Sequence, residues 1–135
     1  MSQTIAQERA KHALMKIEEM KDSDADDGHL CSHIAGFPAM ILMSGFGQAS
    51  AFYLSKGGTR KLAYDALEDW LCSGHRPFSG AQGDHLLMTA ITEGNAANYR
   101  LAQAEALAYL DWLKKFAKAF LKSQDAPITT DEEDD

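Results

Sequence analysis

Histidine and cysteine side chains, the usual protein ligands of zinc, stand close together at two places in the sequence. His29, Cys31 and His33 occupy alternate positions, and Cys72 is followed by His75. A structural zinc site needs four converging ligands, and the sequence lacks the Cys-x-x-Cys spacing that commonly supplies them. Alternate positions of a helix also point to different faces. We therefore predict no metal site, with exposed histidines and cysteines in the core.

Acidic side chains form a second candidate cluster, in the segment DSDADDG at positions 22–28. A calcium-binding loop places its ligands at defined alternate positions and closes with a Glu, which this segment lacks. We therefore predict an exposed loop. Asp65, Glu68 and Asp69 fall on the predicted solvent side of a helix and are interpreted as ordinary surface groups.

Catalytic residues do not stand out. Ser44, Ser50, Ser55 and the five histidines are scattered, without a recognisable set of nucleophile, base and orienting acid. The stretch Gly45-Phe46-Gly47 has part of a dinucleotide-binding loop, but that loop needs a preceding strand and a third glycine. We predict no catalytic residue, no cofactor and no enzymatic activity, and assign these glycines to helix turning and close packing.

Basic side chains are the best functional candidates, because they can neutralise phosphates. Three surround the Gly57-Gly58 pair and four lie on the last long helical stretch: Lys56, Arg60, Lys61, Arg100, Lys114, Lys115 and Lys118. A phosphate-binding role requires these residues to share one surface of the fold. Otherwise they are solvated helix faces, and the last lysines stabilise a helix dipole. The sequence leaves both interpretations open.

The overall charge hides a basic body. The chain has 135 residues and a net charge of −7, but ten acids lie in residues 22–27 and 125–135. Without those ten charges, −7 becomes +3. Global acidity therefore does not exclude a nucleic-acid partner.

Helical periodicity runs through nearly the whole sequence, and no stretch alternates like a strand. We expect an all-α fold: a single compact bundle of about six helices with a long C-terminal helix. Predicted helical segments cover residues 3–21, 29–36, 38–44, 46–56, 60–73, 85–93 and 98–122. Asp27, Thr59 and Asp84 are the predicted caps and Pro38 the predicted start of its own helix, whereas Thr4 and Glu8 miss capping-box spacing by one residue.

The long stretch 98–122 is predicted to organise the core, since a broad apolar face covers about half its circumference. That face contains Tyr109, Leu110, Trp112, Leu113, Phe116, Ala117, Phe120 and Leu121. The nearly all-apolar stretch 38–44 is predicted to be buried on most sides. Residues 1–124 are expected to form one all-helical domain and residues 125–135 an acidic disordered tail.

Localisation is predicted to be cytoplasmic. The two cysteines offer no disulfide framework, which indicates a reducing compartment. The first residues lack the apolar region of a signal peptide, and the longest apolar run, 37–43, is too short to span a bilayer.

Three segments resemble a known family. They are QERAKHALMKIEE at 7–19, FPAMILMSGFGQASAFYLSKG at 37–57 and NYRLAQAEALAYLDWLKKFAKAF at 98–120. Their order, spacing and interruptions are similar to the small helical subunit of the type III-B CRISPR effector, the Cmr complex. The similarity extends over nearly all of residues 3–122, and the middle segment is the most specific.

This resemblance implies a non-catalytic subunit of an RNA-guided antiviral complex. Copies would stack head to tail beside the subunits that hold the CRISPR RNA, and their basic surface would line the channel for target RNA. The partners would be the other effector subunits, copies of itself, and the backbones of the CRISPR RNA and target RNA. The seven basic residues named above would then be the RNA-binding residues.

Alternatives remain open. A purely structural spacer without RNA contact would bury aromatics such as Tyr53 or Phe78 against the next copy. A ligand-binding or catalytic bundle would line an internal pocket with His12, His85 and Tyr99. The acidic loop and tail depart from the family pattern. We expect them to face away from RNA; the alternative is that they occupy a basic surface before RNA arrives.

Overall fold

Six helices make up the fold. The computed structural model describes residues 3–73, 76–80 and 85–121. The helices are α1 (Ile5–Lys21), α2 (Asp27–Ser44), α3 (Phe46–Lys56), α4 (Gly58–Leu71), α5 (Leu86–Glu93) and α6 (Ala96–Phe120). No strand occurs within the described residues. The all-α prediction with a long C-terminal helix is therefore confirmed.

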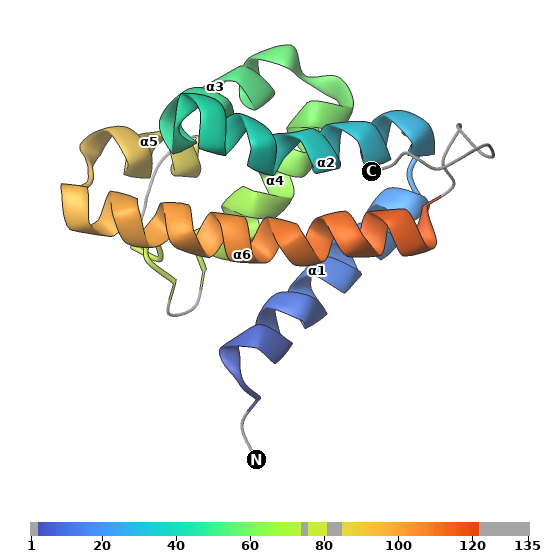
Figure 1. Cartoon of the computed structure of the whole chain (residues 1–135), viewed down its shortest axis with the longest axis horizontal. Coiled ribbons are helices and arrows are strands. Elements are labelled where there is room, and N and C mark those ends of the chain that lie inside the picture. The colour runs from blue at the N-terminus through green and yellow to red at the C-terminus, as the bar shows by residue number, and fades with distance from the viewer. Residues whose placement is uncertain (1–2, 74–75, 81–84, 122–135) are drawn as a thin grey trace.

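The long helix α6 lies along one side of the molecule and is the element on which the others are assembled (Figure 1). Helix α2 runs antiparallel to it, and α3 and α4 pack on α2. Helix α1 crosses α6 obliquely and has its most extensive packing with that helix. The short α5 packs against α3 and α4.

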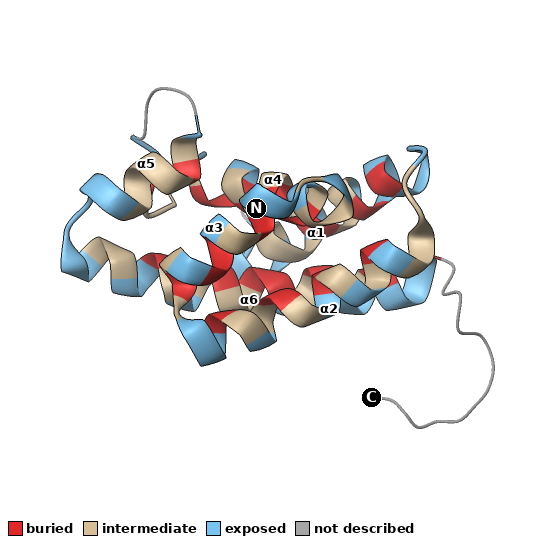
Figure 2. Ribbon diagram, turned by 90° about the horizontal axis from the view of Figure 1, so that it is seen from above, coloured by how far each residue is buried: buried red, intermediate tan, exposed pale blue. Residues whose placement is uncertain are grey.

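The core gathers where these helices face one another (Figure 2). Its largest fully buried side chains include Tyr64, Tyr109, Phe37 and Phe46. On α6, Tyr109, Leu110 and Leu113 are buried as predicted. Trp112 and Phe116 are only partly buried, however, and Phe120 is 46% exposed. The buried stripe of α6 is therefore narrower than the sequence suggested.

A capping box begins α1, contrary to the sequence interpretation. The Thr4 hydroxyl accepts a hydrogen bond from the Gln7 backbone N–H, and the Gln7 side chain accepts one from the Thr4 N–H. Glu8, which suggested a mismatch of one residue, is not the partner. Gln7 stands three residues after Thr4 and completes the motif.

Helix α2 is continuous through Pro38, so the predicted second start at that residue is wrong. Proline inside a helix removes one backbone donor and costs about 3 kcal/mol. Ile34, Phe37 and Ile41 are buried on both sides of the proline, and each such burial contributes about 1.5–3 kcal/mol. Burial along one continuous helix therefore outweighs the cost of Pro38.

The end of α2 is exposed, although its apolar sequence predicted burial on most sides. Leu42 is 73% exposed and Met43 is 85% exposed. They precede Gly45, whose φ of 93° turns the chain into α3. Only Ile41 of this last turn lies in the core.

Two helix starts also differ from their predicted caps. Asp26, and not Asp27, caps α2 by accepting from the His29 N–H. Gly57 occupies the cap position of α4, while the Thr59 hydroxyl contacts His33 Nδ1 at 2.5 Å. The predicted cap Asp84 lies outside the described residues, as do the boundary at 124 and the tail 125–135. No described helix has the length and apolarity needed to cross a bilayer.

Candidate nucleic-acid interface

The seven basic candidates fall into two groups on different elements. We call Lys56, Arg60 and Lys61 the junction group, because they flank the turn between α3 and α4. We call Arg100, Lys114, Lys115 and Lys118 the α6 group. Helix α2 packs against α3, α4 and α6 and lies between the two groups (Figure 1). The structure therefore places the candidates as two separate basic surfaces.

An aromatic ring organises the junction group. Lys56 Nζ lies 5.3 Å and Arg60 Cζ 5.4 Å from the centre of the Phe52 ring. Such cation–π contacts hold a charge in place without neutralising it. Lys61 differs, since its ammonium forms a salt bridge with Asp65 at 3.0 Å. Lys56 and Arg60 therefore carry the usable positive charge of this group.

The start of α4 adds to that positive field. Gly57 offers no side chain to cap the first backbone N–H groups of the helix, and these groups form the positive end of the helix dipole. The neighbouring His33 ring stacks on His29, with ring centres 5.9 Å apart. Burial, followed by the charge of Arg60 and the proximity of His29, lowers the pKa of His33. His33 therefore stays neutral beside the two cations.

One face of α6 carries the second group. Arg100, Lys114 and Lys118 are separated by 14 and 4 residues, which places them within about 40° of one another around the helix. All three are exposed, and they form no salt bridge with any described residue. Lys115, by contrast, is paired with Asp111 at 2.7 Å. The α6 group thus offers three uncompensated cations.

A network of long-range polar contacts holds α6 in place, and sequence reasoning missed it. Arg9 on α1 binds Glu105 on α6, and Trp70 on α4 donates its indole N–H to the same carboxylate. The guanidinium of Arg76 lies 3.7 Å from the Trp70 ring centre and binds Glu8. These residues come from distant parts of the chain, and no local spacing in the sequence indicates their pairing.

Two of the acids interpreted as surface groups belong to this framework. Glu68 accepts a hydrogen bond at 2.9 Å from the Leu87 N–H in the first turn of α5. Asp69 lies 2.7 Å from His12 Nε2. Glu68 and Asp69 therefore connect α4 to α5 and α1, although the Asp69 side chain is 52% exposed, in agreement with the predicted solvent side. Asp65 remains on the surface with Lys61.

The three residues proposed to line a ligand pocket, His12, His85 and Tyr99, have separate structural roles. His12 forms hydrogen bonds with Tyr109 and Asp69. Tyr99 lies near the start of α6, and its hydroxyl accepts a hydrogen bond from the Gly47 N–H of α3. His85 precedes α5 in a left-handed backbone conformation. These three side chains do not meet in one site.

Metal-ligating side chains do not gather either. Within the described residues, no group of three or more His, Cys, Asp or Glu could hold a metal ion. The Cys31 thiol donates a hydrogen bond to the Ala117 carbonyl oxygen. Both cysteines are half-buried at the edge of the core, whereas the sequence predicted them inside it. His75 lies outside the described residues.

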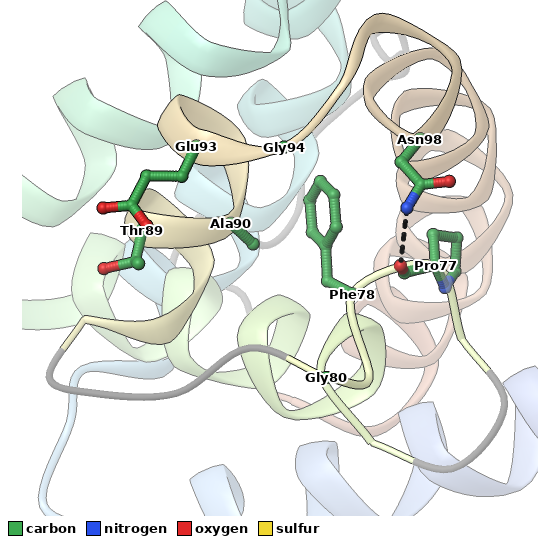
Figure 3. A pocket seen from close by; sticks show the side chains of 8 residues that line it. All are labelled: Pro77, Phe78, Gly80, Thr89, Ala90, Glu93, Gly94 and Asn98. Atoms are coloured by element: carbon green, nitrogen blue, oxygen red, sulfur yellow. Dashed lines mark hydrogen bonds between the residues drawn. The ribbon is translucent and has the colours of Figure 1, made fainter.

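A hollow of about 430 Å³ lies between the α4–α5 connection, α5 and the start of α6 (Figure 3). It is lined by Pro77, Phe78, Gly80, Thr89, Ala90, Glu93, Gly94 and Asn98. Asn98 donates to the Pro77 carbonyl oxygen across its rim. Glu93 is the one ionisable side chain among these eight, so the lining carries no catalytic pair.

Comparison with known proteins finds one matching family model and a solved structure from the same family. A family model described as "CRISPR-associated protein (Cas_Cmr5)" matches residues 5–120. A solved CRISPR-associated Cmr5 family protein from Thermus thermophilus has the same fold, with a TM-score of 0.74. It is 25% identical, and the match covers 89% of this chain and 100% of that chain.

Proposed function

The chain belongs to the Cas_Cmr5 family and is thus a small subunit of the Cmr complex, the type III-B CRISPR effector, and we propose that it binds target RNA there without catalysing a reaction. The observation that carries this proposal is the set of uncompensated cations on α6: Arg100, Lys114 and Lys118. They lie on one exposed face of a long helix, where each can contact a phosphate of a strand that follows the helix.

The mechanism is electrostatic. Lysine and arginine side chains neutralise phosphates and release condensed counterions, so binding weakens as the salt concentration rises. Contacts of this kind position a strand but read no sequence. Base pairing with the CRISPR RNA would supply the specificity, and cleavage would belong to other subunits. Copies stacked along the complex would extend the basic face.

The junction group supports a second contact with RNA. Lys56 and Arg60 stand beside the uncapped start of α4, where backbone N–H groups favour an anion. Because α2 separates this group from α6, the two groups would hold different stretches of RNA or different strands. Lys61 and Lys115 contribute less in this proposal, since Asp65 and Asp111 already compensate them.

The experiment compares two double variants in the assembled complex. Lys114→Ala with Lys118→Ala removes two α6 cations, and Lys11→Ala with Lys21→Ala removes two exposed cations from α1. We expect only the α6 variant to weaken target-RNA binding, with the log–log salt slope reduced by about 1.4, since each single-strand contact contributes about 0.7. Equal affinities and slopes for both variants would disprove RNA binding by α6.

A purely structural spacer is the second candidate. The prediction that Tyr53 or Phe78 packs against the next copy is wrong. The two side chains are 2% and 5% exposed and belong to the chain's own core. Leu42 and Met43 at the end of α2 are the most exposed large apolar side chains among the described residues, and they favour a protein partner instead. A spacer role predicts that these residues matter for assembly while the basic faces do not.

A further inference from the structure

Helix α1 is attached to the rest of the fold in different ways along its length. Its buried side chains, Ala13, Ile17 and Met20, all belong to its C-terminal half. The N-terminal half, residues 5–12, has no buried residue and extends past the other helices (Figure 1). We call this half the α1 arm. Its largest apolar side chain, Ile5, is 44% exposed, so apolar burial fixes the C-terminal half of α1 and not the arm.

Ion pairs hold the arm in place of apolar packing. Arg9 binds the Glu105 carboxylate on α6 through two of its nitrogens. Glu8 accepts a hydrogen bond at 2.9 Å from Arg76, which lies in the connection between α4 and α5. Lys11 is exposed and forms no salt bridge with any described residue. Two ion pairs therefore connect the arm to two different parts of the fold.

The arm covers an aromatic stack in the core. The rings of Trp70 and Tyr109 are nearly parallel, with centres 5.4 Å apart, and are 2% and 0% exposed. The His12 ring at the end of the arm lies 5.3 Å from Trp70 and 5.2 Å from Tyr109. Its two nitrogens contact Asp69 and the Tyr109 hydroxyl. Arg76, which Glu8 binds, lies 3.7 Å from the centre of the Trp70 ring.

We propose that the α1 arm opens and closes as a unit while residues 13–21 stay docked. The pairs Arg9–Glu105 and Glu8–Arg76 form its latch. In the open state one side of the aromatic stack becomes accessible to water. The latch is a property of the free chain and does not depend on RNA binding.

Separation of the latch pairs is less costly than exposure of the core, because water solvates the freed charges. The Glu8 side chain is 40% exposed, so solvent already screens its pair with Arg76. The pair of Arg9 with Glu105 is the stronger one, since these side chains are 20% and 13% exposed. A helix end with few buried apolar contacts opens at a lower free-energy cost than the whole fold. The arm should therefore open many times for each global unfolding event.

A capping box keeps the free end of the arm helical. Thr4 and Gln7 exchange hydrogen bonds there, which opposes fraying from the first residue. The arm is therefore expected to open by release of the latch and not residue by residue. Because the latch consists of charges, salt and charged partners shift it towards the open state.

The test compares two double variants that both keep the net charge at −7. Glu8→Gln with Arg9→Gln removes both latch pairs, and glutamine retains a similar helix propensity. The matched control, Asp111→Asn with Lys115→Gln, removes an exposed ion pair on α6. Each variant exchanges one acid and one base for neutral amides. Any difference between them is therefore due to position and not to charge.

Backbone amide hydrogen exchange of the full-length chain gives the first readout. In the unaltered chain, we expect protection factors about tenfold lower for residues 9–12 than for residues 17–20. The latch variant should lower protection of residues 9–12 by about a further tenfold, with little change at residues 17–20. The control should match the unaltered chain. Equal protection of both segments in the unaltered chain, or an equal loss along all of α1 in the latch variant, would overturn the proposal.

The salt dependence of the same exchange rates identifies the latch. Raising the salt concentration should lower the protection of residues 9–12 by about threefold in the unaltered chain and in the control. The latch variant should respond much less, because it has no latch pair left to screen. An equal salt response in all three proteins would show that these two ion pairs do not hold the arm.

Discussion

Arg9 and Glu105 form a two-pronged ion pair between α1 and α6, with Nε–Oε2 and Nη2–Oε1 distances of 2.6 and 2.9 Å. The Trp70 indole N–H adds a third bond to this carboxylate at 2.8 Å. Burial works to raise the pKa of Glu105, but the bonds from Arg9 and Trp70 bring it below its usual value. One carboxylate thus joins three helices behind the basic face of α6.

Glu105→Gln is predicted to destabilise the fold by about 2 kcal/mol, because it leaves Arg9 partly buried without its counter-charge. Urea unfolding measures the change. Since the native pKa of Glu105 is lowered, its contribution is complete above pH 4.5 and is lost as pH falls through that native value. The difference between the two proteins should shrink accordingly in acid.

Asp111→Asn provides the control on the same helix. It breaks the exposed Lys115–Asp111 pair, in which both side chains are about 60% exposed. The expected cost is below about 0.5 kcal/mol. Equal losses for the two variants would contradict the assigned role of Glu105.

His12 is predicted to make stability depend on pH. Its Nε2 lies 2.7 Å from Asp69 Oδ2 and its Nδ1 2.6 Å from the Tyr109 hydroxyl, so the neutral tautomer with the proton on Nε2 satisfies both contacts. Burial, partly opposed by the bond to Asp69, lowers the pKa of His12. The unfolded chain therefore takes up the proton first, and stability falls as pH drops from 6.5 through the native value.

The measurement is the thermal midpoint as a function of pH for the unaltered chain and for His12→Gln. The variant should have a shallower slope below pH 6.5, and the slope that remains includes the contribution of His33, whose pKa is also lowered. His29→Gln serves as control, because the His29 side chain is 65% exposed. A slope below pH 6.5 that is as steep in His12→Gln as in the unaltered chain would refute this assignment.

Gly45→Ala is predicted to cost about 1–3 kcal/mol. The backbone at Gly45 has φ 93° and ψ 156°, a region that only glycine adopts without strain. This geometry separates α2 from α3 and sets the position of Gly47, whose N–H donates to Tyr99. Gly80→Ala is the control, since an added methyl group meets nothing within 4 Å. Thermal unfolding should show a loss only at Gly45.

Leu42→Ser with Met43→Ser tests the protein-contact surface at the end of α2. Both side chains project from the fold, so stability should change by less than about 0.5 kcal/mol. Incorporation of the variant into the Cmr complex, measured by co-purification with the other subunits, should fall. Normal incorporation would show that this apolar pair faces no partner.

Local chemistry in the sequence determined much of the fold. Helical periodicity predicted the helical segments, the class and the long last helix, because side-chain spacing is a property of neighbouring residues. The glycines at 45 and 57 marked true breaks, since each adopts a positive φ there. The same spacing puts Lys114 and Lys118, four residues apart, on one side of the last helix.

Tertiary structure decided the features that depend on contacts between residues far apart in the sequence. Pro38 continues α2 because burial of residues on both sides outweighs its lost hydrogen bond. Glu68 and Asp69 became framework residues only when α4 met α5 and α1. The separation of the junction group from α6 likewise follows from α2 packing between them, and local residue spacing carries no information about which helices pack together.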